Sequence, residues 1–100
     1  RAVLANAARL RQGLAGLGFR VPPGETPIIP VLVGEADQAL RLAEELLARG
    51  VYAPAIRPPA VPPGTARLRV TVSAAHASEE LDAALEAFAA AGRAAGVLPG

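Results

Sequence analysis

Residues 56–76 read IRPPAVPPGTARLRVTVSAAH, a proline-stiffened loop that runs directly into an alternating strand. The strand alternates apolar residues with polar ones, namely Leu68, Val70 and Val72 with Arg67, Arg69 and Thr71. Successive side chains of a strand point to opposite faces of its sheet. The segment therefore predicts a sheet that buries the apolar set and carries Arg67 and Arg69 on its other face.

Helical spacing of apolar residues marks three further segments. Helices are predicted for residues 2–17 and 36–49, each followed by a glycine that offers a left-handed stop, Gly18 and Gly50. In the second helix the apolar stripe is expected on Ala36, Leu40, Ala43 and Leu47, flanked by Ala39 and Leu46. A last helix is expected to begin near Ser78, which can cap it, and to run toward the C-terminus.

Two short apolar runs, residues 28–33 and 51–56, predict the other strands. Pro30 lies in the first run, and because proline cannot donate to a ladder it marks an edge or irregular position. The order helix, strand, helix, strand, strand, helix indicates the α+β fold class. We expect helices on one face of a small antiparallel or mixed three-stranded sheet.

The composition fits one domain and argues against several classes of partner. The chain has 100 residues, enough for one core, and it contains no cysteine, which is compatible with the cytosol. The net charge of +1 gives no electrostatic reason to bind nucleic acid or an anionic membrane, and no apolar run approaches the length of a membrane span. We therefore expect a soluble, cytoplasmic domain with no nucleic-acid partner and no membrane partner.

Residues 54–69, PAIRPPAVPPGTARLR, and residues 73–76, SAAH, resemble a signature of the α-oxoamine synthases. In that family, which depends on pyridoxal phosphate (PLP), the segment is similar to Pro-Ala-Ile-Arg-Pro-Pro-Thr-Val-Pro-x-Gly-Thr-Ala-Arg-Leu-Arg followed by Ser-Ala-Ala-His. The resemblance implies that residues 1–100 are the small C-terminal domain of a PLP fold-type I (aspartate aminotransferase-like) enzyme, whose large PLP-binding domain lies upstream. The composition agrees, because the chain has no lysine and cannot form a Schiff base with PLP. We expect PLP to bind the missing large domain, and this chain alone to be inactive.

The resemblance also implies candidate substrate-binding residues. Arg69, the second arginine of Ala-Arg-Leu-Arg, matches the residue that holds the α-carboxylate of the amino-acid substrate, and a planar guanidinium suits a carboxylate. Ala60 stands where the family has a threonine near the acyl substrate, and alanine cannot make the hydrogen bond of the threonine hydroxyl. Either that bond is dispensable, or a water makes it, or the acyl specificity of this protein differs. Arg57 is a further candidate, for an anionic contact with the acyl thioester. His76 has no second metal-binding side chain nearby in the sequence and is expected to be structural, so we expect no catalytic, cofactor-binding or metal-ligating residue in this chain.

For the intact protein the resemblance implies a homodimeric acyltransferase that joins an amino acid to an acyl thioester with loss of carbon dioxide. The loop at residues 56–59 is similar to the branch of the family that uses L-alanine and a pimeloyl thioester. The tail, residues 87–97, resembles instead the branch that uses glycine and acetyl-CoA. A branch that transfers longer acyl chains also stays open.

A hypothesis from another class is a stand-alone α+β ligand-binding module or a structural adaptor, because fold alone does not decide function. An upstream domain with a cofactor-binding lysine would favour the enzyme, and an initiator methionine directly before Arg1 would favour the module. The adaptor predicts that substitution of Arg69 changes nothing. In the enzyme, the sheet face with Arg67 and Arg69 is expected to meet the large domain.

Overall fold

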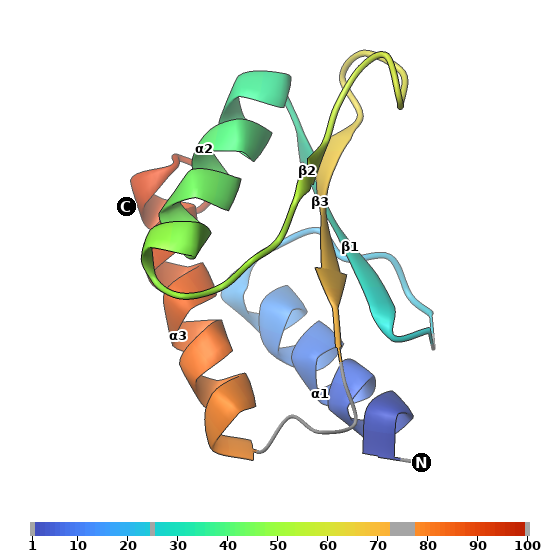
Figure 1. Cartoon of the computed structure of the whole chain (residues 1–100), viewed down its shortest axis with the longest axis vertical. Helices are drawn as coiled ribbons and strands as arrows, with labels where there is room; N and C mark the ends of the chain where they lie inside the picture. Colours follow the sequence, from blue (N-terminus) through green and yellow to red (C-terminus); the bar gives the residue numbers. More distant parts are fainter. Residues whose placement is uncertain (1, 25, 73–77, 100) are drawn as a thin grey trace.

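The computed structural model describes residues 2–24, 26–72 and 78–99. The elements in chain order are α1 (Ala2–Leu17), β1 (Ile28–Gly34), α2 (Ala36–Ala48), β2 (Ala55–Ile56), β3 (Ala66–Thr71) and α3 (Ser78–Ala94). This order confirms the predicted α+β arrangement of helices with a small three-stranded sheet (Figure 1). Within the described chain, no helix is long and apolar enough to cross a membrane.

The sheet is antiparallel throughout, with β3 in the centre between β1 and β2. The register of β1 and β3 places Pro30 opposite Arg69 and Leu32 opposite Arg67. The structure confirms that Pro30 lies in an edge strand. Beyond that edge the Leu32 N–H donates to the Arg20 carbonyl at 2.9 Å, an isolated bridge that covers part of the edge.

The second predicted strand, residues 51–56, is shorter in the structure, because only Ala55 and Ile56 pair with β3. The cause lies at the end of α2. The N–H of Val51 donates to the Leu46 carbonyl at 2.9 Å, which keeps the chain close to the helix after its last turn. Residues 51–54 therefore approach β3 from the side of the helices, and regular pairing with β3 begins only at Ala55.

Glycines end the three described helices, as predicted for Gly18 and Gly50. Their φ angles are +111° and +85°, and Gly96 after α3 has a φ of +78°. At each end the N–H groups of the glycine and of the next residue donate to carbonyls of the last turn, at 2.9 to 3.2 Å. Side chains are disfavoured at such φ angles, so these glycines determine where each helix stops.

The core lies between the helices and the inner face of the sheet. The predicted inner residues are buried, with exposed fractions of 0% for Leu68, 6% for Val70 and 3% for Val72. From α3, Phe88 is 0% exposed, and its ring meets that of Phe19 edge to face, with centroids 5.6 Å apart and an interplanar angle of 83°. These two rings are the only phenylalanines of a core otherwise built from aliphatic side chains.

The apolar side of α2 differs from the prediction, because Leu47 is 60% exposed and the other three residues of the predicted stripe are only partly buried. The buried residues of this helix are Ala39, Leu42 and Leu46. Polar side chains next to that stripe reach the end of α3, where Arg41 Nη2 donates to the Ala94 carbonyl at 2.8 Å and Gln38 Nε2 to the Gly96 carbonyl at 3.0 Å. These contacts with the end of α3 set the rotation of α2 about its axis. They join residues more than 50 positions apart, so the apolar spacing within α2 could not predict them.

Two helical glycines give opposite predictions for substitution by alanine. A Cβ at Gly16 would meet nothing within 4 Å, so Gly16→Ala is expected to stabilise the chain by about 0.5–1 kcal/mol, because alanine loses less entropy in a helix. A Cβ at Gly92 would lie 2.7 Å from Phe19 Cζ, so Gly92→Ala is expected to destabilise it by about 1–3 kcal/mol through overpacking. Urea unfolding of both variants checks the pair. A more stable Gly92→Ala protein would contradict the close packing of Phe19 on α3.

Candidate substrate-binding site

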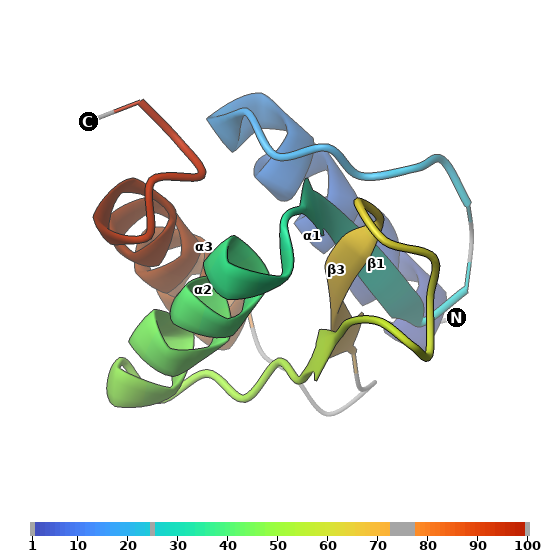
Figure 2. The same cartoon turned by 90° about the horizontal axis from the view of Figure 1, so that it is seen from above.

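The sheet has one face that no described helix covers, called the open face below. Its side chains stand at alternating positions of the three strands, namely Ile28, Pro30, Leu32, Ile56, Arg67, Arg69 and Thr71. Figure 2 shows α2 and α3 together on the other side of the sheet. Exposure agrees with this assignment, because Ile28 is 47% exposed although its neighbour Ile29 is 0% exposed. The open face is therefore available to a ligand or to another part of a longer chain.

Arg69 lies on the central strand, within the open face. Its N–H donates to the Pro54 carbonyl at 3.0 Å, and its Cα stands opposite Pro30, so neighbours on both sides fix its backbone. The side chain is exposed, and its guanidinium makes no hydrogen bond or ion pair with any residue that the structure describes. By contrast, Arg49 on the helical layer pairs with Glu45 at 2.6 Å. Arg69 thus offers its planar set of donors to an external anion.

Arg67 is the second cation of the open face and is held more tightly. The residue is half-buried, and its cross-strand neighbours are Leu32 on β1 and Ile56 on β2. Its Nε–H donates to the Thr65 carbonyl at 3.0 Å. That bond orients the guanidinium and leaves its terminal nitrogens without a partner among the residues described.

The loop at residues 57–65 projects beyond the sheet and carries Arg57 and Ala60 (Figure 1). The peptide bond between Pro58 and Pro59 is cis, and the Ala60 N–H donates to the Arg57 carbonyl at 3.0 Å. The resulting four-residue turn leaves Arg57 and Ala60 exposed. The structure therefore places these two candidates on the loop after β2, adjacent to the open face and not on it.

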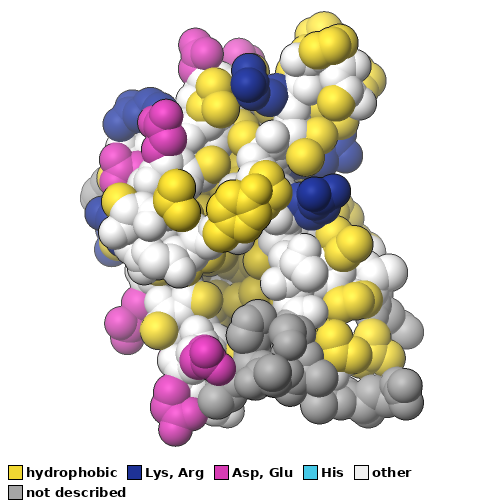
Figure 3. Space-filling model, in the orientation of Figure 1, with side chains coloured by type: hydrophobic (Ala, Val, Ile, Leu, Met, Phe, Trp, Pro, Cys, Tyr) yellow, Lys and Arg dark blue, Asp and Glu magenta, His cyan; other side chains and the backbone are white. Residues whose placement is uncertain are grey.

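Charges are segregated between the two layers of the molecule. The carboxylates among the described residues lie in α2 or α3 or directly before α2. The strands, the segment between α1 and β1 and the loop at residues 57–65 instead carry four arginines, Arg20, Arg57, Arg67 and Arg69, and no carboxylate among the residues described there. Figure 3 shows the same division, with acidic side chains over the helices and only basic ones over the sheet and its loop. This distribution favours an anionic ligand on the sheet side.

The sequence pattern does not indicate Arg20 as a candidate, but the structure places it at the end of the sheet next to the loop at residues 57–65. One of its terminal nitrogens lies 3.7 Å from the position that a Cβ on Gly34 would take, and the Gly64 carbonyl lies 3.6 Å from that position. Arg20 thus borders the base of the loop at residues 57–65. No local signal could have indicated this, because Arg20 reaches β1 through a single non-local bridge to Leu32.

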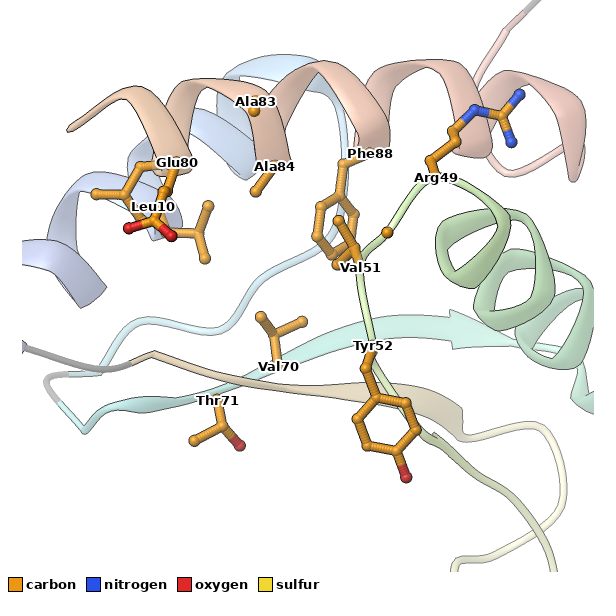
Figure 4. A pocket seen from close by; sticks show the side chains of 12 residues that line it. Leu10, Arg49, Val51, Tyr52, Val70, Thr71, Glu80, Ala83, Ala84 and Phe88 are labelled. Carbon is orange, nitrogen blue, oxygen red and sulfur yellow. The ribbon is translucent and has the colours of Figure 1, made fainter. Parts of the chain in front are cut away.

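A pocket of about 350 Å³ lies on the helix side of the sheet, between α3, the segment after α2 and the end of β3 (Figure 4). Figure 4 shows Phe88 and Val70 pointing toward each other across it, whereas Thr71 points away to the other side of the sheet. Its charged lining residues are Arg49 and Glu80. None of the substrate-binding candidates from the sequence lines this pocket.

The residues of this chain do not fit a PLP site. The chain has no lysine, so none of its side chains can hold PLP as a Schiff base. In the described ranges, no group of three His, Cys, Asp or Glu residues comes together in a way that could hold a metal ion. His76, expected to be structural, lies outside the described residues. What the chain offers is a set of arginines that can bind anions.

Comparison with known proteins assigns the chain to a family. Residues 1–88 match the family model described as aminotransferase class I and II. The 8-amino-7-oxononanoate synthase of Aeromonas hydrophila is 57% identical over 80 residues, which are 80% of this chain and 20% of that relative. The protein of the same name from Alkalilimnicola ehrlichii is 55% identical over 80 residues, again 80% of this chain and 20% of the relative. The chain therefore spans about a fifth of the length of these curated relatives.

Solved structures share the fold. The serine palmitoyltransferase of Sphingomonas wittichii gives a TM-score of 0.93 at 37% identity, over 98% of this chain and 25% of that one. A serine palmitoyltransferase solved with PLP gives a TM-score of 0.92 at 36% identity, over 97% of this chain and 25% of that one. This chain belongs to the aminotransferase class I and II family, in agreement with the resemblance of its loop and central strand to the α-oxoamine synthases.

Proposed function

We propose that residues 1–100 form the small C-terminal domain of an 8-amino-7-oxononanoate synthase of biotin biosynthesis. That enzyme condenses L-alanine with a pimeloyl thioester and releases carbon dioxide. The names of relatives at 55% and 57% identity support this reading, as does the loop at residues 56–59. PLP supplies the electron sink for such chemistry, and we assign its binding to the part of the parent protein outside this chain.

The observation that carries the proposal is the placement of Arg69. Its guanidinium stands on a fixed central strand, on the open face, without a partner among the described side chains. In the proposed enzyme it donates two parallel hydrogen bonds to the α-carboxylate of L-alanine. A carboxylate held in this way orients the amino acid before the reaction, which removes entropy from the chemical step.

The loop after β2 is proposed to line the acyl side of the site. Ala60 is exposed there and offers a methyl group where the family has a threonine hydroxyl. The hydrogen bond of that hydroxyl is therefore dispensable, is made by a water, or is absent because the acyl group differs. Arg57, exposed in the same turn, is proposed to contact an anionic group of the thioester.

The chain spans 20% of one relative and 25% of a structural neighbour, and we propose that it is likewise part of a longer parent protein. We propose that the remaining part forms the large PLP-binding domain and packs against the open face, so that Arg69 is enclosed between the two. The exposed apolar side chain of Ile28 suits such a contact. The parent is further proposed to be a homodimer.

Two other acyltransferases remain as candidates. A 2-amino-3-ketobutyrate CoA ligase, which joins glycine to acetyl-CoA, is favoured by the tail at residues 87–97, AFAAAGRAAGV. An enzyme that transfers a longer acyl chain is favoured by the TM-score of 0.93 with a serine palmitoyltransferase.

Turnover by the full-length parent separates these candidates. We expect kcat/KM for L-alanine with pimeloyl-CoA to exceed that for glycine with acetyl-CoA, and that for L-serine with palmitoyl-CoA, by roughly 10-fold or more. A preference for the glycine pair would identify the ligase instead. Turnover of none of the three pairs would contradict the enzyme and favour a ligand-binding module. Residues 1–100 alone are the control and should show no turnover, because they contain no lysine.

A further inference from the structure

We propose that Arg67 binds an anionic group of the acyl thioester while Arg69 binds the amino acid. This inference rests on the proposed function and deepens it, because it assigns the second substrate to a second arginine of the open face. The ligand chemistry is a carboxylate or phosphate, whose paired oxygens match a guanidinium. A pimeloyl thioester of CoA has two such sources, the terminal carboxylate of its acyl chain and the phosphates of its carrier.

The packing of Arg67 favours a bound anion. The residue is half-buried between Leu32 and Ile56, whereas Arg69 is exposed. Partial burial removes some of the water around the side chain, whereas the unpartnered terminal nitrogens of Arg67 are not buried and stay accessible to a ligand. The Thr65 carbonyl, 3.0 Å from Nε, replaces part of that water but carries no full negative charge. An external anion would supply the missing charge.

The described chain supplies no such charge. The ion pairs found among its residues join Arg9 with Asp82 and Arg49 with Glu45, on the helices, and neither involves the open face. Arg69 adds a second positive charge on the same strand as Arg67, at a spacing of about 7 Å. Two like charges on one strand face repel each other, and a bound anion offsets that repulsion.

The spacing also makes Arg67 a subsite of its own. Two residues along a strand separate the Cα atoms of Arg67 and Arg69 by about 7 Å, and a carboxylate that pairs bidentately with Arg69 engages both of its oxygens there, which leaves Arg67 for a second anionic group. Through Thr65, Arg67 is tied to the loop at residues 57–65. That loop carries Ala60, which the proposed function assigns to the acyl side.

Steady-state kinetics of the full-length parent with Arg67→Gln test the inference. Wild type and variant are compared with pimeloyl-CoA, with heptanoyl-CoA, which lacks the terminal carboxylate, and with pimeloyl-N-acetylcysteamine, which lacks the phosphates. With pimeloyl-CoA we expect KM to rise roughly 10- to 100-fold, as for the loss of one charge-assisted pair. The rise should disappear with heptanoyl-CoA if Arg67 binds the carboxylate, and with the N-acetylcysteamine thioester if it binds phosphate.

Two controls separate this role from loss of folding. Arg93→Gln removes the same charge from an exposed position on α3 and should leave each KM within about two-fold of wild type. The shift of the cofactor spectrum on addition of L-alanine should be equal in wild type and Arg67→Gln. An equal rise of KM with all three thioesters, or no rise, would overturn the inference, because Arg67 would then pair with another part of the parent or only support the loop.

Failure of the proposed function would look different. If the wild-type parent uses another acyl-CoA in place of pimeloyl-CoA, the biotin-pathway assignment is lost. Comparing that acyl-CoA with its N-acetylcysteamine thioester still decides whether Arg67 binds phosphate. An equal rise of KM in Arg67→Gln with both thioesters would overturn phosphate binding by Arg67 as well.

Discussion

Arg69→Ala in the full-length parent is expected to weaken the binding of L-alanine by roughly 10- to 100-fold, the loss typical of a charge-assisted hydrogen-bonded pair. The guanidinium has no hydrogen-bond or ion-pair partner among the described residues, so its removal breaks no such interaction with them. A titration of L-alanine, followed by the absorbance of the bound cofactor, measures the affinity directly. The kcat/KM for L-alanine should fall by at least the same factor.

Arg69→Lys is the sharper variant, because it keeps the charge and removes the planar pair of donors. We expect it to restore only part of the affinity, since an ammonium binds a carboxylate as a point charge. The KM for the acyl thioester should stay near that of wild type, in contrast to Arg67→Gln. An unchanged affinity for L-alanine in Arg69→Ala would refute the proposal that Arg69 binds the substrate carboxylate. It would support the hypothesis that the chain is a structural adaptor.

Both the faces of β3 and the ends of the helices could be predicted because their causes are local. Alternation along one strand separates Val70 from Arg69 whatever the rest of the fold is, and the structure buries the first and exposes the second. Gly18 and Gly50 stop their helices because positive φ angles favour glycine. Arg57 and Ala60 are candidates because a contiguous stretch of sequence resembles the α-oxoamine synthases, and the structure places both in one turn.

Features that depend on distant parts of the chain could not be predicted. Leu47 fits an apolar stripe but is 60% exposed, because contacts between α2 and the end of α3 set the rotation of the helix. Residues 51–54 look like strand, but the end of α2 holds Val51. Arg20 reaches the sheet through an isolated antiparallel bridge to Leu32, which is 12 residues further along the chain. An arginine and a leucine at these positions give no sign that they pair.

Phe88→Ala is expected to have the largest effect on stability, about 3–5 kcal/mol. The ring is 0% exposed, packs edge to face on Phe19 and lines the pocket of about 350 Å³ between α3 and the sheet. Truncation removes the contact with Phe19 and enlarges the pocket. The chain has no tryptophan or methionine whose side chain could move into the space left by the ring. Because a domain of this size has a total stability of about 5–15 kcal/mol, the variant should lose a large fraction of it.

Urea unfolding followed by far-ultraviolet circular dichroism measures the loss, with Tyr52→Ala as the matched control. Tyr52 is also aromatic but 75% exposed, so its truncation should change the free energy of unfolding by no more than about 0.5 kcal/mol. Similar losses for both variants would contradict a core centred on α3. A large loss for Phe88→Ala alone would show that the packing of α3 on the inner face of the sheet stabilises the fold that carries Arg69 on the opposite face.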